Sequence, residues 1–167
     1  MFEFRVASAR NGQMYVDSAF GHHREVLRGM KALLLYQFPY GNWSAEEQAD
    51  FFCDTVGRLR PHEMMMLDIE AGSGIGDPAD FTRRWLARAE GRLGGLAWVY
   101  VPSALAAAVT REVTGPRLVK APRYSGHAGR GAAPWWPHDV HQYTDKGYFP
   151  GCAKSGDLNY TTLSVDQ

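Results

Sequence analysis

Residues 64–74 have the sequence MMMLDIEAGSG, in which an apolar run ends abruptly in two carboxylates and a glycine-rich loop. Such a run is typical of a buried β-strand, on which side chains alternate between the two faces. Asp68 and Glu70 are therefore expected to point the same way, with Ile69 turned to the opposite side. Paired acids at the end of a buried strand are costly to desolvate and are typical of acid–base sites. The same pattern also arises by chance where a strand enters a solvated loop. The choice between an acid–base site and a chance pattern therefore depends on the rest of the chain.

On both sides of this stretch, strand-like runs alternate with helix-like patterns. Strands are predicted at residues 2–7, 32–38, 64–69, 96–101 and 117–121. Helices are predicted at residues 17–30, at 45–59 behind the capping box of Ser44 and Glu47, after Asp77-Pro78, and at 103–113. Beyond residue 122 the helical periodicity ends, and strands are predicted only at 139–143 and near 157–160. This order predicts a parallel α/β sheet with helices outside it, barrel-like, with an irregular β-only end.

Composition limits the class of protein. The chain has 167 residues, 45% of them hydrophobic, which suits one domain over residues 1–167 with a substantial core. Eighteen basic residues balance 18 acidic ones, so no nucleic-acid or membrane partner is expected. There is no long apolar span and no Sec-type signal pattern, which predicts synthesis in the cytoplasm. Cys53 and Cys152 lie far apart in the sequence and are expected to be free thiols.

The histidines and glycines do not form a cofactor motif. His22 and His23 are adjacent and cannot share a helix face, while His138 and His141 fall on opposite faces of a strand. No cysteine lies at ligand spacing from them, so no metal site is expected. The G-S-G-I-G run at 72–76 lacks the lysine and the spacing of a phosphate loop, so we expect no cofactor.

Several short motifs occur in a fixed order along the chain. They are Y-V-D at 15–17 with Phe20, Y-Q-F at 36–38, Q-A-x-x-F at 48–52, L-D-I-E at 67–70, H-Q-Y at 141–143 and D-L-N at 157–159. In this order and spacing the chain resembles the catalytic domain of glycoside hydrolase family 25, the Chalaropsis-type lysozymes, which cleave the muramic-acid linkage of peptidoglycan. The resemblance covers essentially the whole chain.

The resemblance implies a TIM-like (β/α)5β3 barrel with its active site at the carboxyl ends of the strands. Glu70 matches the general acid, which protonates the glycosidic oxygen. Asp68 matches the second acid, often assigned to positioning or polarising the N-acetyl group so that the substrate itself acts as nucleophile. Asp157 matches a third acid that faces the same groove. From the residues alone, the charge of Asp68 is expected to raise the proton affinity of Glu70.

Aromatic residues at or just past the predicted strand ends are candidates for binding sugar rings. They are Tyr36, Phe38, Tyr40, Trp43, Tyr100, Tyr124, Trp135, Trp136 and Tyr143. Core filling is the alternative for Phe38 and Tyr100, and loop anchoring for the Trp135-Trp136 pair. The predicted substrate-binding set is Asp157, Tyr36, Phe38, Tyr40, Tyr100, Tyr124, Gln142 and Asn159.

Three departures from the family pattern matter. Gln37 replaces the usual histidine and His141 the usual tryptophan, and either could alter the groove. The family's first strand, with its aspartate, has no counterpart here, so the domain is expected to be incomplete at the N-terminus. A barrel without that strand would expose two edges, which another chain, a rearranged N-terminus or a lost segment would have to cover.

The leading functional hypothesis is a glycoside hydrolase. It is a 1,4-β-N-acetylmuramidase, of phage-endolysin type or a wall-lytic module, that acts on bacterial peptidoglycan without a cofactor. Two alternatives stay open. One is a weak or inactive barrel that binds a glycan, which the missing strand favours. The other is a barrel hydrolase for chitin-like or other glycans.

Overall fold

The protein forms one mixed α/β sheet with helices on its outer side. The computed structural model describes residues 2–10, 12–124, 139–148 and 155–163. The strands are β1 (Phe2–Arg10), β2 (Gln13–Val16), β3 (Leu33–Phe38), β4 (Glu63–Asp68), β5 (Trp98–Tyr100), β6 (Val119–Pro122), β7 (Val140–Gly147) and β8 (Gly156–Thr161). The helices are α1 (Phe20–Val26), α2 (Ala45–Val56), α3 (Pro78–Leu93) and α4 (Arg111–Thr114), with 3-10 turns η1 (Ala71–Ser73) and η2 (Ser103–Leu105).

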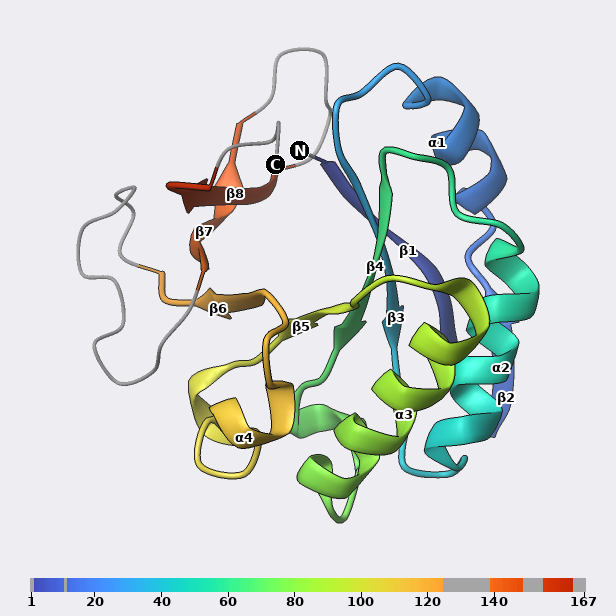
Figure 1. Ribbon diagram of the computed structural model, residues 1–167. Coiled ribbons are helices and arrows are strands. Elements are labelled where there is room, and N and C mark those ends of the chain that lie inside the picture. Colours follow the sequence, from blue (N-terminus) through green and yellow to red (C-terminus); the bar gives the residue numbers. More distant parts are fainter. Residues whose placement is uncertain (1, 11, 125–138, 149–154, 164–167) are drawn as a thin grey trace.

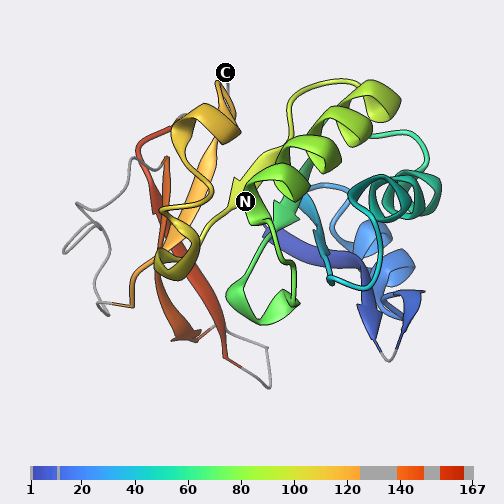
Figure 2. The same cartoon turned by 90° about the horizontal axis from the view of Figure 1, so that it is seen from below.

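The eight strands follow the order β2-β1-β3-β4-β5-β6-β7-β8. The pairs from β1 through β7 are parallel, and β2 and β8 add antiparallel at the two ends. The sheet curls, with α1, α2 and α3 on its convex side and with β7 and β8 across the interior from β1 (Figures 1 and 2). Within the described residues β8 does not pair with β1, so the sheet forms a partial barrel that stays open between them.

The local signals at the helix starts are confirmed. The Ser44 side chain accepts a hydrogen bond from the Glu47 backbone N–H, and the Glu47 carboxylate accepts one from the Ser44 backbone, so the capping box is complete. Asp77 caps α3, with Pro78 in its first turn. No helix in the described part of the chain is both long and apolar enough to cross a membrane.

Two predicted helices differ in extent or kind, and one hairpin was not predicted. The helix predicted at 17–30 shortens to Phe20–Val26, and residues 103–113 form η2 and the one-turn α4 instead of one helix. Thr110 has an extended backbone and interrupts the helix predicted at residues 103–113. The β-branched residues of this stretch lower its helix propensity. The β1–β2 hairpin was missed, although Gly12 takes a positive φ of 74° in the two-residue turn and the Asn-Gly pair is a strong hairpin signal.

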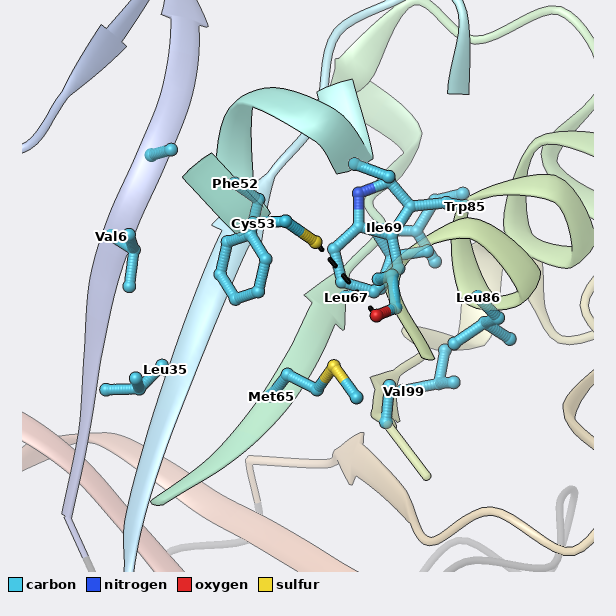
Figure 3. Close-up of a cluster of buried hydrophobic side chains, with 14 of the residues drawn as sticks. Val6, Leu35, Phe52, Cys53, Met65, Leu67, Ile69, Trp85, Leu86 and Val99 are labelled. Carbon is cyan, nitrogen blue, oxygen red and sulfur yellow. Dashed lines mark hydrogen bonds between the residues drawn. The ribbon is translucent and has the colours of Figure 1, made fainter. Parts of the chain in front are cut away.

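The main hydrophobic core lies between the sheet and the helices (Figure 3). Leu35, Met65, Leu67 and Val99 point outward from neighbouring strands and pack in one cluster with side chains of α2 and α3. Trp85 of α3 is fully buried there. Burial of such large apolar side chains supplies about 1.5–3 kcal/mol each relative to exposure, so this layer holds α2 and α3 on the sheet.

A second, smaller core fills the concave side of the same sheet. Its members are Leu34, Met66, Trp98, Tyr100 and Val140, with Tyr36, Met64 and Leu118 packed against them. They alternate along the strands with the outward-facing residues, as a pleated sheet requires. The concave face is therefore apolar at its centre and becomes polar toward the carboxyl ends of the parallel strands.

Candidate active site

The two acids of the opening motif lie where β4 ends. Asp68 is the last residue of β4 and lies opposite Tyr100 of β5. The Ile69 N–H donates to the Tyr100 carbonyl oxygen at 3.3 Å, and its side chain is fully buried in the outer core. Asp68 and Glu70 flank it, both half-buried. The alternation predicted for Ile69 is confirmed, and it leaves the two carboxylates on the other side of the chain.

Two further acids reach the same region from distant parts of the chain. Glu3 lies on β1 and Asp157 on β8, and both act electrostatically on Asp68. Asp157 also acts on Glu70 and receives a hydrogen bond from the Gln142 side chain on β7. The curl of the sheet thus brings together acids separated by up to about 150 positions in the chain.

Burial and mutual repulsion keep protons on these acids. Burial raises the pKa of Asp68 to about 8, and the charge of Glu70 adds to the increase. One oxygen of Asp68, Oδ1, is shielded from solvent and has no hydrogen-bond partner among the described residues. Burial, followed by the charge of Asp157, raises the pKa of Glu70. We expected Asp68 to raise the proton affinity of Glu70, but the larger shift falls on the more deeply buried Asp68. The pair therefore retains a proton near neutral pH.

Three tyrosines surround the acids. Tyr36 on β3 is half-buried, Tyr100 on β5 is buried, and Tyr124, just past β6, is 58% exposed. Burial raises the pKa of Tyr36 and of Tyr100 above the ordinary value, and nearby carboxylates add to both shifts. The side chains of Tyr100 and Tyr124 hydrogen-bond to each other. All three rings thus carry neutral hydroxyl groups at the end of the sheet where Asp68 lies.

Phe38 and Tyr40 lie at the end of β3, with ring centroids 5.3 Å apart. Gln48 of α2 fixes the loop that carries Tyr40, and its amide is fully buried. It accepts a hydrogen bond from the Tyr40 backbone N–H at 2.9 Å, and its nitrogen donates to the carbonyl oxygens of Tyr40 and Trp43. Sequence reasoning missed this role. The available signal was a glutamine among the inward positions of an amphipathic helix, where a polar group needs partners.

Gly41 joins this loop to the loop that follows Glu70. Its N–H donates to the Ser73 carbonyl oxygen at 2.8 Å, and a Cβ at this position would lie 2.1 Å from the Gly74 carbonyl oxygen. Gly41→Ala is expected to destabilise the fold by about 2 kcal/mol or more, because backbone must move to make room. Thermal unfolding measures the loss. Gly21→Ala is the matched control, since Gly21 lies in α1 with nothing near its Cβ position. Equal stability of the two variants would contradict the close approach.

Other predicted residues lie in different environments. Gln37 is fully buried and accepts a hydrogen bond from Trp85 Nε1 at 2.8 Å, so it faces the helix layer. The expectation that it could alter the groove is wrong, because it alternates with Tyr36 along β3. His141 is buried, with Nε2 2.8 Å from the Arg123 carbonyl oxygen.

Gln142 and Asn159 are paired neighbours on β7 and β8. Each has a buried side-chain oxygen without a hydrogen-bond partner among the residues described. Trp135 and Trp136 lie outside the described residues. In the described ranges no group of three or more His, Cys, Asp or Glu side chains is placed to hold a metal ion.

No protein-family model and no curated protein matches the sequence. Solved structures match along nearly the whole chain. A lysozyme from Streptomyces coelicolor superposes with a TM-score of 0.78 over 98% of this chain and 82% of its own, at 18% identity. The chain has the fold of the family 25 glycoside hydrolases. A family 25 glycosyl hydrolase from Bacillus anthracis gives a TM-score of 0.78 over 99% of this chain and 79% of its own, at 15% identity.

A muramidase from Trichobolus zukalii shares the fold as well, with a TM-score of 0.74 and 20% identity over 98% of this chain and 83% of its own. The structures that share the fold thus include proteins described as lysozymes, muramidases and family 25 glycosyl hydrolases. The resemblance inferred from the short motifs agrees with this result. At these identities the likeness is one of fold alone.

Proposed function

We propose that this protein is a peptidoglycan-hydrolysing muramidase, a glycoside hydrolase that cleaves the β-1,4 bond between N-acetylmuramic acid and N-acetylglucosamine. The observation that carries the proposal is the pair of half-buried acids, Asp68 and Glu70, at the end of β4 in a fold shared with known muramidases. Acids of raised pKa at the carboxyl ends of parallel strands suit general acid catalysis near neutral pH.

In the proposed reaction Glu70 donates its proton to the glycosidic oxygen as the bond to the sugar breaks. Asp68 orients the neighbouring N-acetyl group, whose carbonyl oxygen attacks the anomeric carbon, and water then opens the cyclic intermediate while giving a proton back to the ionised Glu70. The shared proton of the pair supplies the acid, and repulsion between the two carboxylates keeps that proton on the pair until the glycosidic oxygen accepts it. We propose that Asp157, Tyr36, Phe38, Tyr40, Tyr100, Tyr124, Gln142 and Asn159 bind the glycan.

We propose a finer assignment for the curled sheet, a (β/α)5β3 barrel that is open between β1 and β8 in the described residues. We infer that another polypeptide segment, from a second copy or a partner chain, covers the open side between β1 and β8, because uncovered strand edges invite pairing. Sedimentation at several concentrations tests self-association. A fully active monomer at every concentration would show that no second copy is required.

Mass spectrometry of digested peptidoglycan tests the proposed bond. A muramidase leaves muramic acid at the new reducing ends, whereas cleavage of the other glycan linkage leaves glucosamine. New reducing-end muramic acid is the expected result. Products ending in glucosamine would assign the protein to a different class of hydrolase. Binding to the wall without release of muropeptides would favour the alternative function, a glycan-binding barrel. The open side of the sheet is the feature that favours this alternative.

A further inference from the structure

Lys120 of β6 is a buried cation on the concave side of the sheet. Only 2% of its side chain is exposed, and its ammonium pairs with the Glu3 carboxylate of β1. It lies 4.0 Å from Asp157 Oδ2 of β8 and 5.4 Å from the centroid of the Tyr100 ring. One side chain thus reaches acids from the two strands that flank the open side of the sheet.

The position does not itself demand a lysine. Lys120 lies beside Tyr100 and Val140 in the register of the sheet, within reach of the apolar inner core. Its neighbours in β6, Val119 and Ala121, point to the other face of the sheet, where Val119 belongs to the outer core. An apolar side chain would suit this surface, and replacing a buried ion pair by well-packed hydrophobic residues is often neutral or stabilising. Stability alone therefore does not account for a charge here.

The surroundings of Lys120 are strongly acidic. Glu3 presents one oxygen, Oε2, that is buried and has no hydrogen-bond partner among the described residues. The charged and titratable groups that act on this cluster are Glu3 and Arg5 from β1, Tyr36 from β3, Asp68 and Glu70 at the end of β4, Tyr100 from β5, Tyr124 after β6, Asp145 from β7 and Asp157 from β8. A positive charge placed among several acids favours their ionised forms.

We propose that Lys120 is a positioning residue that sets the charge of the acid cluster and anchors Glu3 and Asp157 beside Asp68. This inference rests on the proposed function for its effect on catalysis, but its electrostatic part concerns the protein alone. Lys120 opposes the increase in the pKa of Asp68 and of Asp157 that burial causes, and for both acids its influence exceeds that of Glu3. Without Lys120 the cluster would hold its protons to higher pH.

The test compares Lys120→Met, which removes the charge, with Lys120→Arg, which keeps it. Carboxyl carbons of Asp and Glu are titrated by NMR in the protein without substrate. Lys120→Met is expected to move the titration of Asp157 to higher pH by about one unit, the usual effect of one close charge. Lys120→Arg should titrate like wild type, as should Lys146→Met, which removes an exposed lysine of β7. An unchanged titration in Lys120→Met would overturn the proposal.

Two further measurements keep the test decisive. If Lys120→Met does not fold, the double variant Glu3→Gln/Lys120→Met removes both charges of the buried pair and should show a smaller shift in the same direction. The pH profile of wall hydrolysis should also move to higher pH in Lys120→Met, and a profile that stays in place would count against Lys120. Wild type that hydrolyses no wall would refute the proposed function instead, and the carboxyl titration would still decide the role of Lys120.

Discussion

Glu70→Gln is expected to lower the rate of muropeptide release by about 1,000-fold, the usual contribution of a general acid. Glutamine keeps the shape of the side chain but has no proton to give to the leaving oxygen. The variant should still fold and bind the wall, because glutamine matches the size of the half-buried Glu70 side chain and the backbone carbonyl that accepts the Ser73 N–H is unchanged. The measurement is the initial rate at which reducing ends appear in purified peptidoglycan.

Glu25→Gln is the matched control for this variant. Glu25 lies on α1 and pairs only at the surface with Arg28 and Arg60, where ion pairs contribute little. The Glu25→Gln variant should digest the wall at the wild-type rate. Hydrolysis that survives Glu70→Gln at full rate would reject Glu70 as the acid, even if the products identify the enzyme as a muramidase.

Asp68→Asn is expected to inactivate the protein and at the same time to stabilise it. The unfolded Asp68 loses its proton near pH 3.8, whereas the folded carboxyl keeps it to about pH 8. Between these values unfolding releases a proton, so the wild-type free energy of unfolding falls as the pH rises. Asparagine does not ionise and escapes this loss. The variant should gain about 5 kcal/mol over wild type by pH 8 and almost nothing below pH 4.

Denaturant unfolding at a series of pH values measures this difference. Asp145→Asn provides the control, since Asp145 is exposed on β7 and its substitution should change stability by less than about 0.5 kcal/mol. If the gain in stability of Asp68→Asn does not grow between pH 4 and pH 8, the pKa of Asp68 is not the one that is strongly raised in the pair. Activity equal to wild type would remove it from the proposed mechanism.

Local patterns predicted much of this fold. The apolar run before Asp68, the capping box at Ser44 and the Asp77-Pro78 pair each depend on neighbouring residues, and each element formed where they predicted it. The helix expected at residues 103–113 did not form, and tertiary packing adds to the low helix propensity of its β-branched residues. There the chain bends so that Val109 enters the outer core, and an extended Thr110 then separates two short turns.

The contacts between distant segments could not be read from the sequence. Asp68 and Glu70 follow from strand alternation, but nothing local pairs Lys120 with Glu3, which lies 117 positions away. Gln37 was misjudged for a similar reason. Gln37 follows Tyr36 in the Y-Q-F motif, which suggests a place in the groove. The packing of α3 on the sheet instead lets Gln37 accept a hydrogen bond from the Trp85 indole N–H. Such pairings are set by the curl of the whole sheet.

The two cores on opposite faces of one sheet have a consequence for how such proteins diverge. Leu67 and Val99 face the helices, while their neighbours Met66 and Trp98 face the concave side. Substitutions at the second set can reshape the surface next to the acids and leave the contacts of α2 and α3 in place. Proteins that share this fold can thus differ in ligand preference while their architecture persists, even at the 15–20% identity of the solved structures that match this chain.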